Sequence, residues 1–262
     1  MENKVLVFDL DGTLLNSRKE INESNIECIT KLTEIGYQII ICTGRKYREA
    51  KEFIKKIQLS KNAFYICDDG AIIYNGLGNV VLKRKDFSLN EVQSILDLYH
   101  LKRCIIYTDE KNYYLSKSMI DMYKHMLWFK IKKFSNIQAR CLKGKNDIIH
   151  IKKIVCYELN NITSTDKQFV IHKFDDKIAE ILPYGCDKYF ALKQLDLMGK
   201  IELGNVIYFG DDENDLECFE NIENTVAMSN AKESIKSKAK YIIGTNESNA
   251  IAEFIKEYLE IY

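Results

Sequence analysis

The chain has 262 residues, and its 38 basic side chains balance its 38 acidic ones. A chain without excess positive charge is poorly suited to displace counterions from nucleic-acid phosphates, so we exclude a nucleic-acid partner. Hydrophobic residues at 46% and interspersed charged residues at 29% are typical of a globular protein and exclude a disordered or fibrous one.

The eight cysteines contain no Cys-x-x-Cys pair, and the four histidines form no His-x-x-x-His pair. Several cysteines lie in apolar runs, where cysteine behaves as a small hydrophobe. We therefore expect reduced core thiols in a cytoplasmic protein. The N-terminal apolar run ends at Asp9, which is too soon for a signal peptide or a membrane span, so we expect no membrane association.

Strand and helix patterns alternate over the first part of the chain. Continuous apolar runs predict buried strands at 5–8, 37–42 and 63–67. Apolar residues at helical spacing predict helices at 22–35 and 46–57 between them. Repeated strand–helix steps of this kind predict a parallel sheet with right-handed crossovers.

The pattern changes in the middle of the chain. Turn signals at Asp69-Gly70 and Asn75-Gly76 frame a predicted hairpin with strands at 71–74 and 80–82. The next hundred residues mix weaker patterns, which predict an α+β unit instead of further strand–helix repeats. Its predicted helices are 88–99, 118–129 and a weak one near 165–173, and its predicted strands are 105–107, 113–115, 151–156 and 178–182.

The first pattern returns after Pro183. The predicted helices are 188–198, 215–220, 231–238 and 248–259, and the predicted strands are 206–209, 225–228 and 241–243. One α/β domain is therefore split by an insertion.

Acidic residues follow the first predicted strand, in Asp9-Leu10-Asp11-Gly12-Thr13-Leu14. Open α/β sheets bind ligands at this edge. Carboxylates beside an apolar strand are costly unless they meet a cation or hydrogen-bond donors, and Gly12 allows the backbone to turn sharply. A turn with solvated aspartates is the simpler alternative.

The second predicted strand ends in Thr43-Gly44-Arg45. The threonine hydroxyl can donate to a phosphate oxygen beside the amide groups of a helix N-terminus. It can equally be an ordinary N-cap of that helix.

The strand at 206–209 ends in Gly210-Asp211-Asp212-Glu213-Asn214-Asp215. Oxygen ligands at this density suit Mg²⁺, although acids are also favoured at any helix start. Lys188 lies in the first turn of the helix at 188–198, where the helix dipole disfavours a lysine. A nearby carboxylate or bound phosphate would explain it, and so would simple solvation.

In this order, the four segments resemble the four motifs of the haloacid dehalogenase-like superfamily. Marks of its Cof-type subfamily are Asp69-Gly70-Ala71-Ile72-Ile73 and Val226-Ala227-Met228-Ser229-Asn230-Ala231. The resemblance covers the whole chain. It implies an α/β fold in which residues 1–82 and 184–262 form a Rossmann-like parallel-sheet core domain and residues 83–183 form an inserted α+β cap domain.

The resemblance also implies site roles. Asp9 would be the nucleophile that forms an aspartyl-phosphate, and Asp11 would be the general acid and then the base. Mg²⁺ would bind the Asp9 carboxylate, the Asp11 backbone carbonyl and the Asp211 carboxylate. The implied phosphate-binding residues are Thr43, Gly44, Lys188 and Asn214, and the implied supporting residues are Asp215, Asp212 and Arg45.

Three positions depart from the subfamily pattern. Asp69 replaces the usual Asn, Asp187 replaces a common Ser, and Tyr189 replaces a small residue. We expect these departures to affect substrate preference and to leave the nucleophile and metal unchanged. A carboxylate at position 69 adds negative charge near the site, and we expect it to favour a polar or cationic leaving group.

The cap would close over the site, exclude water and select the leaving group. Its candidate substrate contacts are Tyr113, Tyr114, Trp128, Lys152 and Lys153, although each of them, taken singly, is better explained as an ordinary residue of the cap's core or surface.

The sequence therefore predicts an Mg²⁺-dependent phosphatase that hydrolyses small phosphorylated metabolites, such as sugar phosphates, as a monomer or weak homo-oligomer. Two alternatives stay open. A phosphomutase would share the nucleophile but pass the phosphoryl group to a second hydroxyl, and a non-catalytic protein would bind a phosphometabolite without turning it over.

Overall fold

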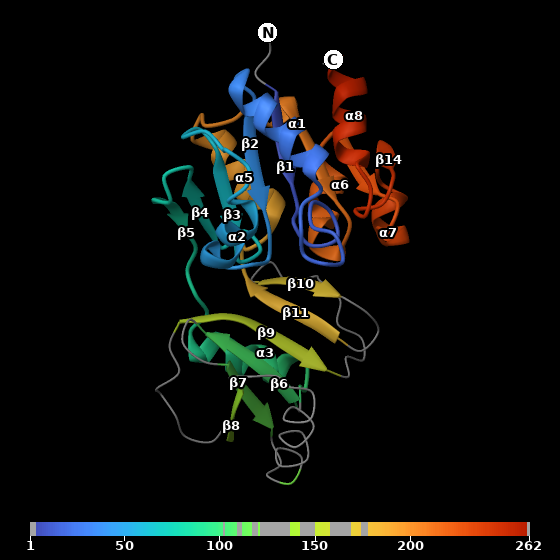
Figure 1. Ribbon diagram of the computed structural model, residues 1–262. Helices are drawn as coiled ribbons and strands as arrows, with labels where there is room; N and C mark the ends of the chain where they lie inside the picture. The colour runs from blue at the N-terminus through green and yellow to red at the C-terminus, as the bar shows by residue number, and fades with distance from the viewer. Residues whose placement is uncertain are drawn as a thin grey trace. The chain divides into compact units, whose positions relative to one another are not determined.

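The computed structural model describes residues 4–101, 103–108, 112–116, 120, 137–141, 150–157, 169–173 and 178–260. The chain forms two compact units (Figure 1). The core unit is Met1–Arg84 with Gly185–Tyr262, and the inserted unit is Lys85–Tyr184.

A single sheet forms the centre of the core unit, with the strand order β14-β13-β12-β1-β2-β3-β4-β5. The strands from β14 to β3 are parallel, and β4 and β5 continue the sheet as an antiparallel hairpin, as predicted. Their bounds are β1 (Val5–Phe8), β2 (Gln38–Cys42), β3 (Phe64–Cys67), β4 (Ile72–Asn75), β5 (Val80–Lys83), β12 (Val206–Gly210), β13 (Asn224–Met228) and β14 (Tyr241–Ile243).

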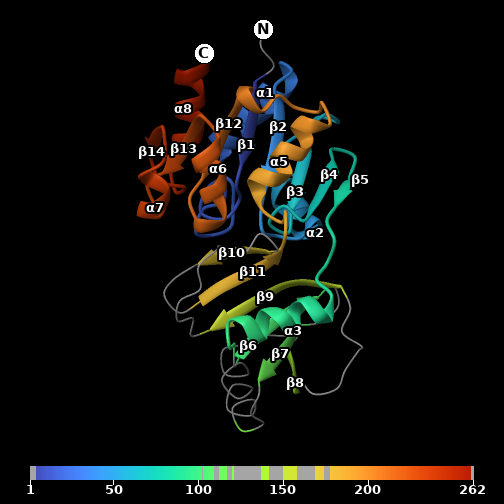
Figure 2. The same ribbon diagram turned by 180° about the vertical axis from the view of Figure 1, so that it is seen from behind.

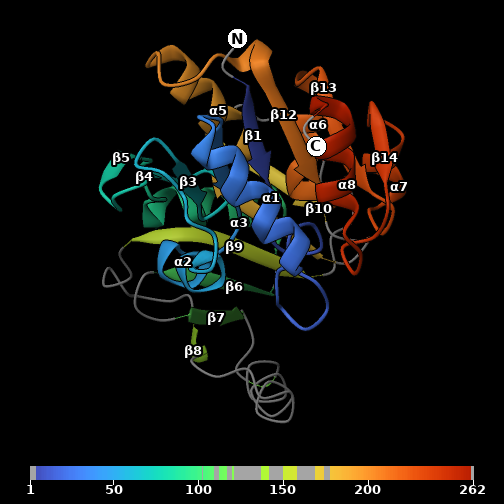
Figure 3. The same ribbon diagram turned by 45° about the horizontal axis from the view of Figure 1, so that its top comes forward.

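Helices cover both faces of this sheet (Figures 2 and 3). One face packs against α1 (Glu23–Glu34), α2 (Tyr47–Ile54) and α8 (Ala250–Leu259), and the other packs against α5 (Lys188–Leu197), α6 (Leu216–Asn221) and α7 (Glu233–Lys236). Successive side chains of a strand point to opposite faces, so Leu6 packs in the first layer and Val7 in the second. Burial on both faces explains why the strands are continuous apolar runs.

The register of the sheet brings three strand ends together. Phe8 at the end of β1 pairs with Ile41 of β2 on one side and with Phe209 of β12 on the other. The residues that follow these strands therefore meet at one edge. They include the loops that begin at Asp9, Thr43 and Asp211.

The inserted unit has its own sheet, with the order β10-β11-β9-β6-β7-β8. Its strands are β6 (Arg103–Thr108), β7 (Asn112–Ser116), β8 (Ile137–Cys141), β9 (Ile151–Tyr157), β10 (Phe169–Lys173) and β11 (Ile178–Pro183). Neighbours are antiparallel except for the parallel pair β7 and β8. Helix α3 (Leu89–Leu98) begins with a capping box at Ser88 and buries Val92, Ile95 and Leu96 with the sheet.

The predicted helix near 165–173 is wrong, because this segment contains the edge strand β10. Phe169-Val170-Ile171 is a run of aromatic and β-branched side chains, which favour strands, and it pairs with Ile181 to Pro183 of β11. Strand β8 lies in a basic stretch where we expected no element. The helix predicted at 118–129 lies outside the described residues except at position 120.

The cysteines with described side chains are all buried, as expected of core residues: Cys28, Cys42, Cys67, Cys104, Cys156, Cys186 and Cys218. Burial raises the pKa of Cys104 to about 12, so this thiol stays protonated. Within the described part of the chain, no helix could span a membrane.

Candidate active site

Lys188 is the first residue of α5, and its side chain is completely buried. Its Nζ donates to Oδ1 of Asp9 and to Oδ1 of Asp215, each at 2.6 Å. Burial alone would lower the pKa of Lys188, but the carboxylates of Asp215 and Asp9 outweigh it and hold that pKa well above its ordinary value. The helix dipole disfavours a lysine in the first turn of α5, and the hydrogen bonds of Lys188 to two carboxylates explain why one is found there.

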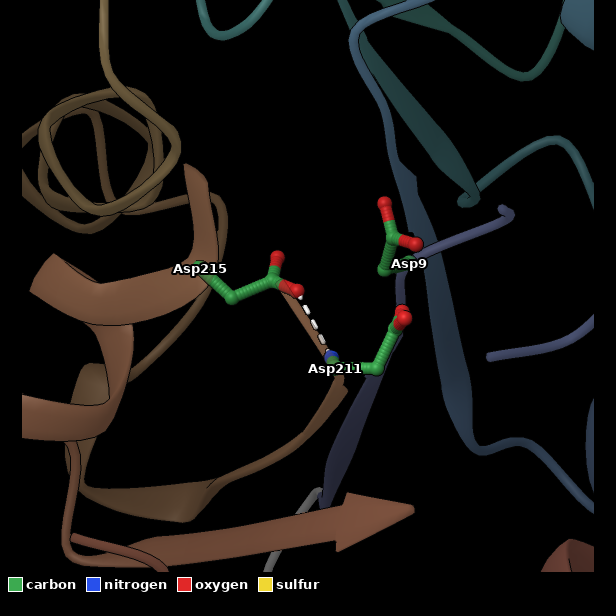
Figure 4. A group of neighbouring side chains, drawn as sticks. All are labelled: Asp9, Asp211 and Asp215. Carbon is green, nitrogen blue, oxygen red and sulfur yellow. Dashed lines mark hydrogen bonds between the residues drawn. The ribbon is translucent and has the colours of Figure 1, made fainter. Parts of the chain in front are cut away.

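Asp215 has both carboxylate oxygens engaged. Besides Lys188, its Oδ1 accepts a hydrogen bond from the Tyr208 hydroxyl at 2.6 Å. Its Oδ2 accepts from the backbone N–H of Asp211 at 2.8 Å, shown in Figure 4, and from that of Asp212 at 3.1 Å. Asp215 therefore fixes the lysine and the acidic loop relative to each other.

Asp9, Asp211 and Asp215 form an acidic cluster whose ligand atoms lie within 4.8 Å of one another (Figure 4). Burial raises the pKa of Asp9 well above its ordinary value, and burial together with Asp215 raises that of Asp211 to about 7. Both carboxylate oxygens of Asp215 already accept hydrogen bonds, so Asp9 and Asp211 are the carboxylates best placed to hold a cation. Such a small carboxylate set suits Mg²⁺, which keeps several waters, and a cation would offset the burial and the repulsion that raise both pKa values.

The loop after β1 is shaped around Asp211. The Thr13 hydroxyl donates to Oδ1 of Asp211 at 2.7 Å. Gly12 has a φ of +84°, and a Cβ at this position would lie 2.1 Å from Oδ2 of Asp211. Asn230 donates from Nδ2 to the Gly12 carbonyl at 2.8 Å. Only glycine fits here, because both the backbone conformation and the space exclude a side chain.

Asp11 binds cationic side chains. Arg45 donates from Nη2 to Oδ1 at 2.6 Å and from Nε to Oδ2 at 2.5 Å, and Lys19 donates to Oδ1 at 2.7 Å. Burial raises the pKa of Asp11, but the hydrogen bonds from Arg45 and Lys19 outweigh it and leave that pKa below its ordinary value. The Asp11 side chain is 39% exposed, so it lies at the rim of the site.

The loop after β2 joins the loop after β3. Thr43 is buried, and its carbonyl accepts a hydrogen bond from the Asp69 N–H at 3.2 Å. Asn214, which we expected to bind phosphate, donates from Nδ2 to Oδ1 of Asp69 at 3.0 Å. Asp212 points elsewhere: it forms an ion pair with Lys232 at 2.6 Å.

The other residues that the sequence suggested near the substrate are those that depart from the subfamily pattern and those of the inserted unit. Those with described side chains are buried, or bond or pack with other residues of the protein. Asp187 caps α5 by accepting the Phe190 N–H at 2.6 Å, and Tyr189 packs on the core. In the inserted unit, Tyr113 and Tyr114 are buried. Lys152 and Lys153 pair with Asp86 and Glu180, respectively. Trp128 lies outside the described residues.

Sequence reasoning missed three participants. Thr13 belongs to the acidic segment Asp9–Leu14, but nothing in the sequence indicated that its hydroxyl donates to Asp211. Tyr208 is an inward residue of β12, and nothing in an apolar strand reveals that its hydroxyl reaches Asp215. Lys19 lies eight positions after Asp11 and donates to it, a pairing that one lysine among many does not signal.

Together, the fold and the site define an α/β enzyme whose acidic centre lies at the strand ends of a parallel sheet and is joined by a buried lysine. The family model for haloacid dehalogenase-like hydrolases matches residues 6–255, so the chain belongs to this family.

Full-length relatives agree with the family match. The chain is 25% identical to the 5-amino-6-(5-phospho-D-ribitylamino)uracil phosphatase YitU of Bacillus subtilis, with 100% of each chain covered. It is 26% identical to the pyridoxal phosphate phosphatase YbhA of Escherichia coli, with 99% of this chain and 100% of the relative covered. A solved haloalkanoate-superfamily phosphatase from Bacteroides thetaiotaomicron has a TM-score of 0.79 at 17% identity, covering 99% of this chain and 96% of the other.

These comparisons confirm the resemblance stated from the motifs. The predicted fold class, a Rossmann-like α/β core with an inserted α+β unit, is confirmed as well. The family and its phosphatase relatives support the predicted enzyme class, a phosphoric monoester hydrolase.

Proposed function

We propose that the protein is an Mg²⁺-dependent phosphatase that hydrolyses small phosphorylated metabolites through an aspartyl-phosphate on Asp9. The observation that carries the proposal is the buried Lys188 ammonium, held at 2.6 Å from both Asp9 and Asp215. A carboxylate attacks a phosphate dianion only where positive charge cancels their repulsion, and Lys188 supplies such a charge at the Asp9 carboxylate.

Asp9 is the nucleophile in this proposal. Its backbone N–H is fixed to the Phe209 carbonyl at 3.0 Å and its Oδ1 is fixed by Lys188, so the carboxylate cannot turn freely. One of its oxygens would attack phosphorus and displace the alcohol, forming the aspartyl-phosphate. Thr43 and Gly44, on the neighbouring strand end, would donate to the phosphoryl oxygens.

The Asp9 and Asp211 carboxylates and the Asp11 backbone carbonyl would hold the magnesium ion. When bound, the ion supplies charge neutralisation to the transferring phosphoryl group. Thr13 and Gly12 prepare the site, since the first donates to Asp211 and the second leaves it space.

Asp11 would act as the general acid and then as the general base. Arg45 and Lys19 favour its anionic form, which suits the second half of the reaction, where the carboxylate takes a proton from the attacking water. To protonate the leaving alcohol first, the carboxylate has to take up a proton from solvent and exchange its contact with Arg45 for one with the substrate oxygen.

We also propose that the inserted residues 83–183 act as a cap that selects the leaving group, while residues 1–82 and 184–262 carry the chemistry. The relatives named for a phosphorylated ribitylaminouracil and for pyridoxal phosphate support a small phosphorylated metabolite as substrate.

The decisive experiment compares wild type with Asp9→Asn on a generic aryl phosphate at saturating Mg²⁺. The asparagine oxygen can still accept from Lys188, so the fold should persist while turnover falls on the order of 10⁴-fold or more. Asp97→Asn, on the exposed side of α3, is the matched control and should retain activity. Substantial turnover by the Asp9→Asn variant would overturn the mechanism.

The same assay separates the alternatives when phosphate and organic products are both counted. A phosphatase releases one orthophosphate for each ester consumed. A phosphomutase yields a rearranged ester with little free phosphate, and a non-catalytic binding protein yields neither product.

A further inference from the structure

Strand β12 is shaped around the Asp215 carboxylate. Alternate residues of a strand point to the same side, so Tyr208 and Gly210 share one face of β12. A Cβ on Gly210, the last residue of the strand, would lie 2.6 Å from Oδ2 of Asp215. The strand therefore leaves space for this carboxylate at its end and places a tyrosine one step deeper on the same face.

The Tyr208 side chain is completely buried and held in place. Its ring packs edge-on against Phe219, with ring centroids 5.9 Å apart, and its hydroxyl donates to Oδ1 of Asp215 at 2.6 Å. Burial, followed by the charge of Asp215, raises the pKa of Tyr208 well above its ordinary value. The hydroxyl therefore keeps its proton and stays a hydrogen-bond donor to the carboxylate.

Oδ1 of Asp215 receives a second donor. The Nζ of Lys188 lies 2.6 Å from this oxygen and also 2.6 Å from Oδ1 of Asp9. A buried series of hydrogen bonds thus leads from the interior of the sheet to the Asp9 carboxylate, through Tyr208, Asp215 and Lys188. Because the hydroxyl stabilises part of the charge on Oδ1, Asp215 draws less of the ammonium charge away from Asp9.

We propose that Tyr208 is a positioning residue: its hydroxyl holds the Asp215 carboxylate so that Lys188 orients the nucleophile for attack on phosphorus. The inference rests on the proposed function, in which Asp9 is that nucleophile. Without the hydroxyl, Lys188 alone would remain of the two donors to Oδ1 of Asp215, and this carboxylate would draw the ammonium away from Asp9. Attack depends on a closely defined geometry of the reacting atoms, so the rate should fall.

The test uses Tyr208→Phe in the full chain, which removes the hydroxyl and keeps the ring. With an aryl phosphate at saturating Mg²⁺, kcat should fall about tenfold, the effect of losing one hydrogen bond to a charged group. Orthovanadate becomes five-coordinate by bonding to the attacking oxygen, so its binding depends on the orientation of Asp9, as the transition state does. Its inhibition constant should rise about tenfold, whereas that of orthophosphate, which forms no such bond, should change by less than about twofold.

Tyr65→Phe is the matched control, because it makes the same chemical change at another buried tyrosine of the same sheet. Tyr65 lies in β3, in the layer opposite to that of Tyr208, and its ring packs edge-on against Tyr47. Its kcat and both inhibition constants should equal those of wild type. Thermal unfolding measures the stability of each variant. An inhibition constant does not depend on the fraction of protein that is folded, so it reports on the site even where a variant is less stable.

An orthovanadate constant that keeps its wild-type value in Tyr208→Phe would overturn the inference, even with a lower Tm, because the hydroxyl would then support only the fold. An equal loss of affinity for orthophosphate and orthovanadate would overturn it too, and so would the same change in Tyr65→Phe. These results leave the proposed function intact. Conversely, a wild-type protein that hydrolyses no phosphate ester with Mg²⁺ would contradict the proposed function, and the inference with it.

Discussion

Arg45 determines the protonation state in which Asp11 rests. Its guanidinium donates to both carboxylate oxygens, the bidentate geometry that makes arginine–carboxylate pairs strong. The pKa of Asp11 is lowered as a result, in spite of the burial that would raise it. The structure therefore holds the proposed acid–base residue in its base form.

We predict that Arg45→Ala moves the acid limb of the kcat profile to higher pH. Without the guanidinium, the pKa of Asp11 rises, and the carboxylate is protonated at a higher pH as the medium is acidified. On acidification, activity that depends on the anionic form of Asp11 is then lost at a higher pH than in wild type. The measurement is kcat against pH for an aryl phosphate with saturating Mg²⁺.

Arg18→Ala serves as the control, because Arg18 is 79% exposed and its ion pair is with Glu20 at 3.5 Å. Its profile should match that of wild type. An acid limb that stays in place in Arg45→Ala would show that the titration of Asp11 does not limit turnover.

For the candidate active site, the sequence predicts which residues take part better than it predicts their contacts. Asp9, Asp211 and Lys188 meet as the motif order implied, because parallel register places their elements at one edge. Asp212 and Asn214 lie in the same acidic loop, yet they face Lys232 and Asp69. The short 3₁₀ turn η2 (Glu213–Asp215) rotates successive side chains to different sides, and the spacing of acids in a sequence does not reveal that rotation.

Among the structural elements, the loop after β1 has the tightest steric requirement. Gly12 combines a left-handed φ with a missing Cβ that would otherwise overlap the Asp211 carboxylate. We predict that Gly12→Ala raises the Mg²⁺ concentration for half-maximal activity at least about tenfold, because Asp211 has to move away from the cation. Backbone strain should also lower the free energy of unfolding by about 1–2 kcal/mol.

Gly36→Ala is a matched control, since Gly36 has a φ of +95° and no atom lies within 4 Å of the Cβ it would gain. It should show the loss of stability without the altered Mg²⁺ requirement. Magnesium activation curves and urea unfolding of both variants provide the comparison. Equal Mg²⁺ requirements in the two variants would contradict the role assigned to Gly12.

Element prediction succeeded where burial imposes a pattern. The core strands β1, β2, β3 and β12 are buried on both faces, so they read as continuous apolar runs. Strand β10 lies at a sheet edge and its burial alternates irregularly, so its short apolar run fitted a helix as well as a strand. Strand β8 is held by pairing with β7, a contact between distant segments that local sequence does not encode.

For the whole molecule, a net charge of zero conceals a strongly acidic centre. The balance of 38 basic and 38 acidic groups is a global figure, while buried acids outnumber buried bases at the strand ends. Such a centre is costly when metal-free, since buried carboxylates repel one another. The stability of the entire fold should therefore depend jointly on pH and on the divalent cation.

We predict that stabilisation by Mg²⁺ grows between about pH 5 and about pH 8. In the metal-free fold, the pKa of Asp211 is about 7 against an ordinary 3.8, so the folded state binds this proton more tightly than the unfolded state. Stability from this group is present below the ordinary pKa and is lost as pH rises through about 7. Magnesium competes with the proton for the same oxygens, so its benefit is small at acid pH and larger once the proton has left.

Thermal unfolding with and without Mg²⁺ across this pH range measures the effect. A cation at about a hundred times its dissociation constant adds about 2.7 kcal/mol of stability, which is readily detected as a shift in Tm. Asp211→Asn should abolish most of the Mg²⁺-dependent shift and flatten its pH dependence, because it removes both the titrating group and a ligand. An Mg²⁺ shift that is the same at both ends of the range, or that survives in Asp211→Asn, would exclude Asp211 as the linked metal ligand.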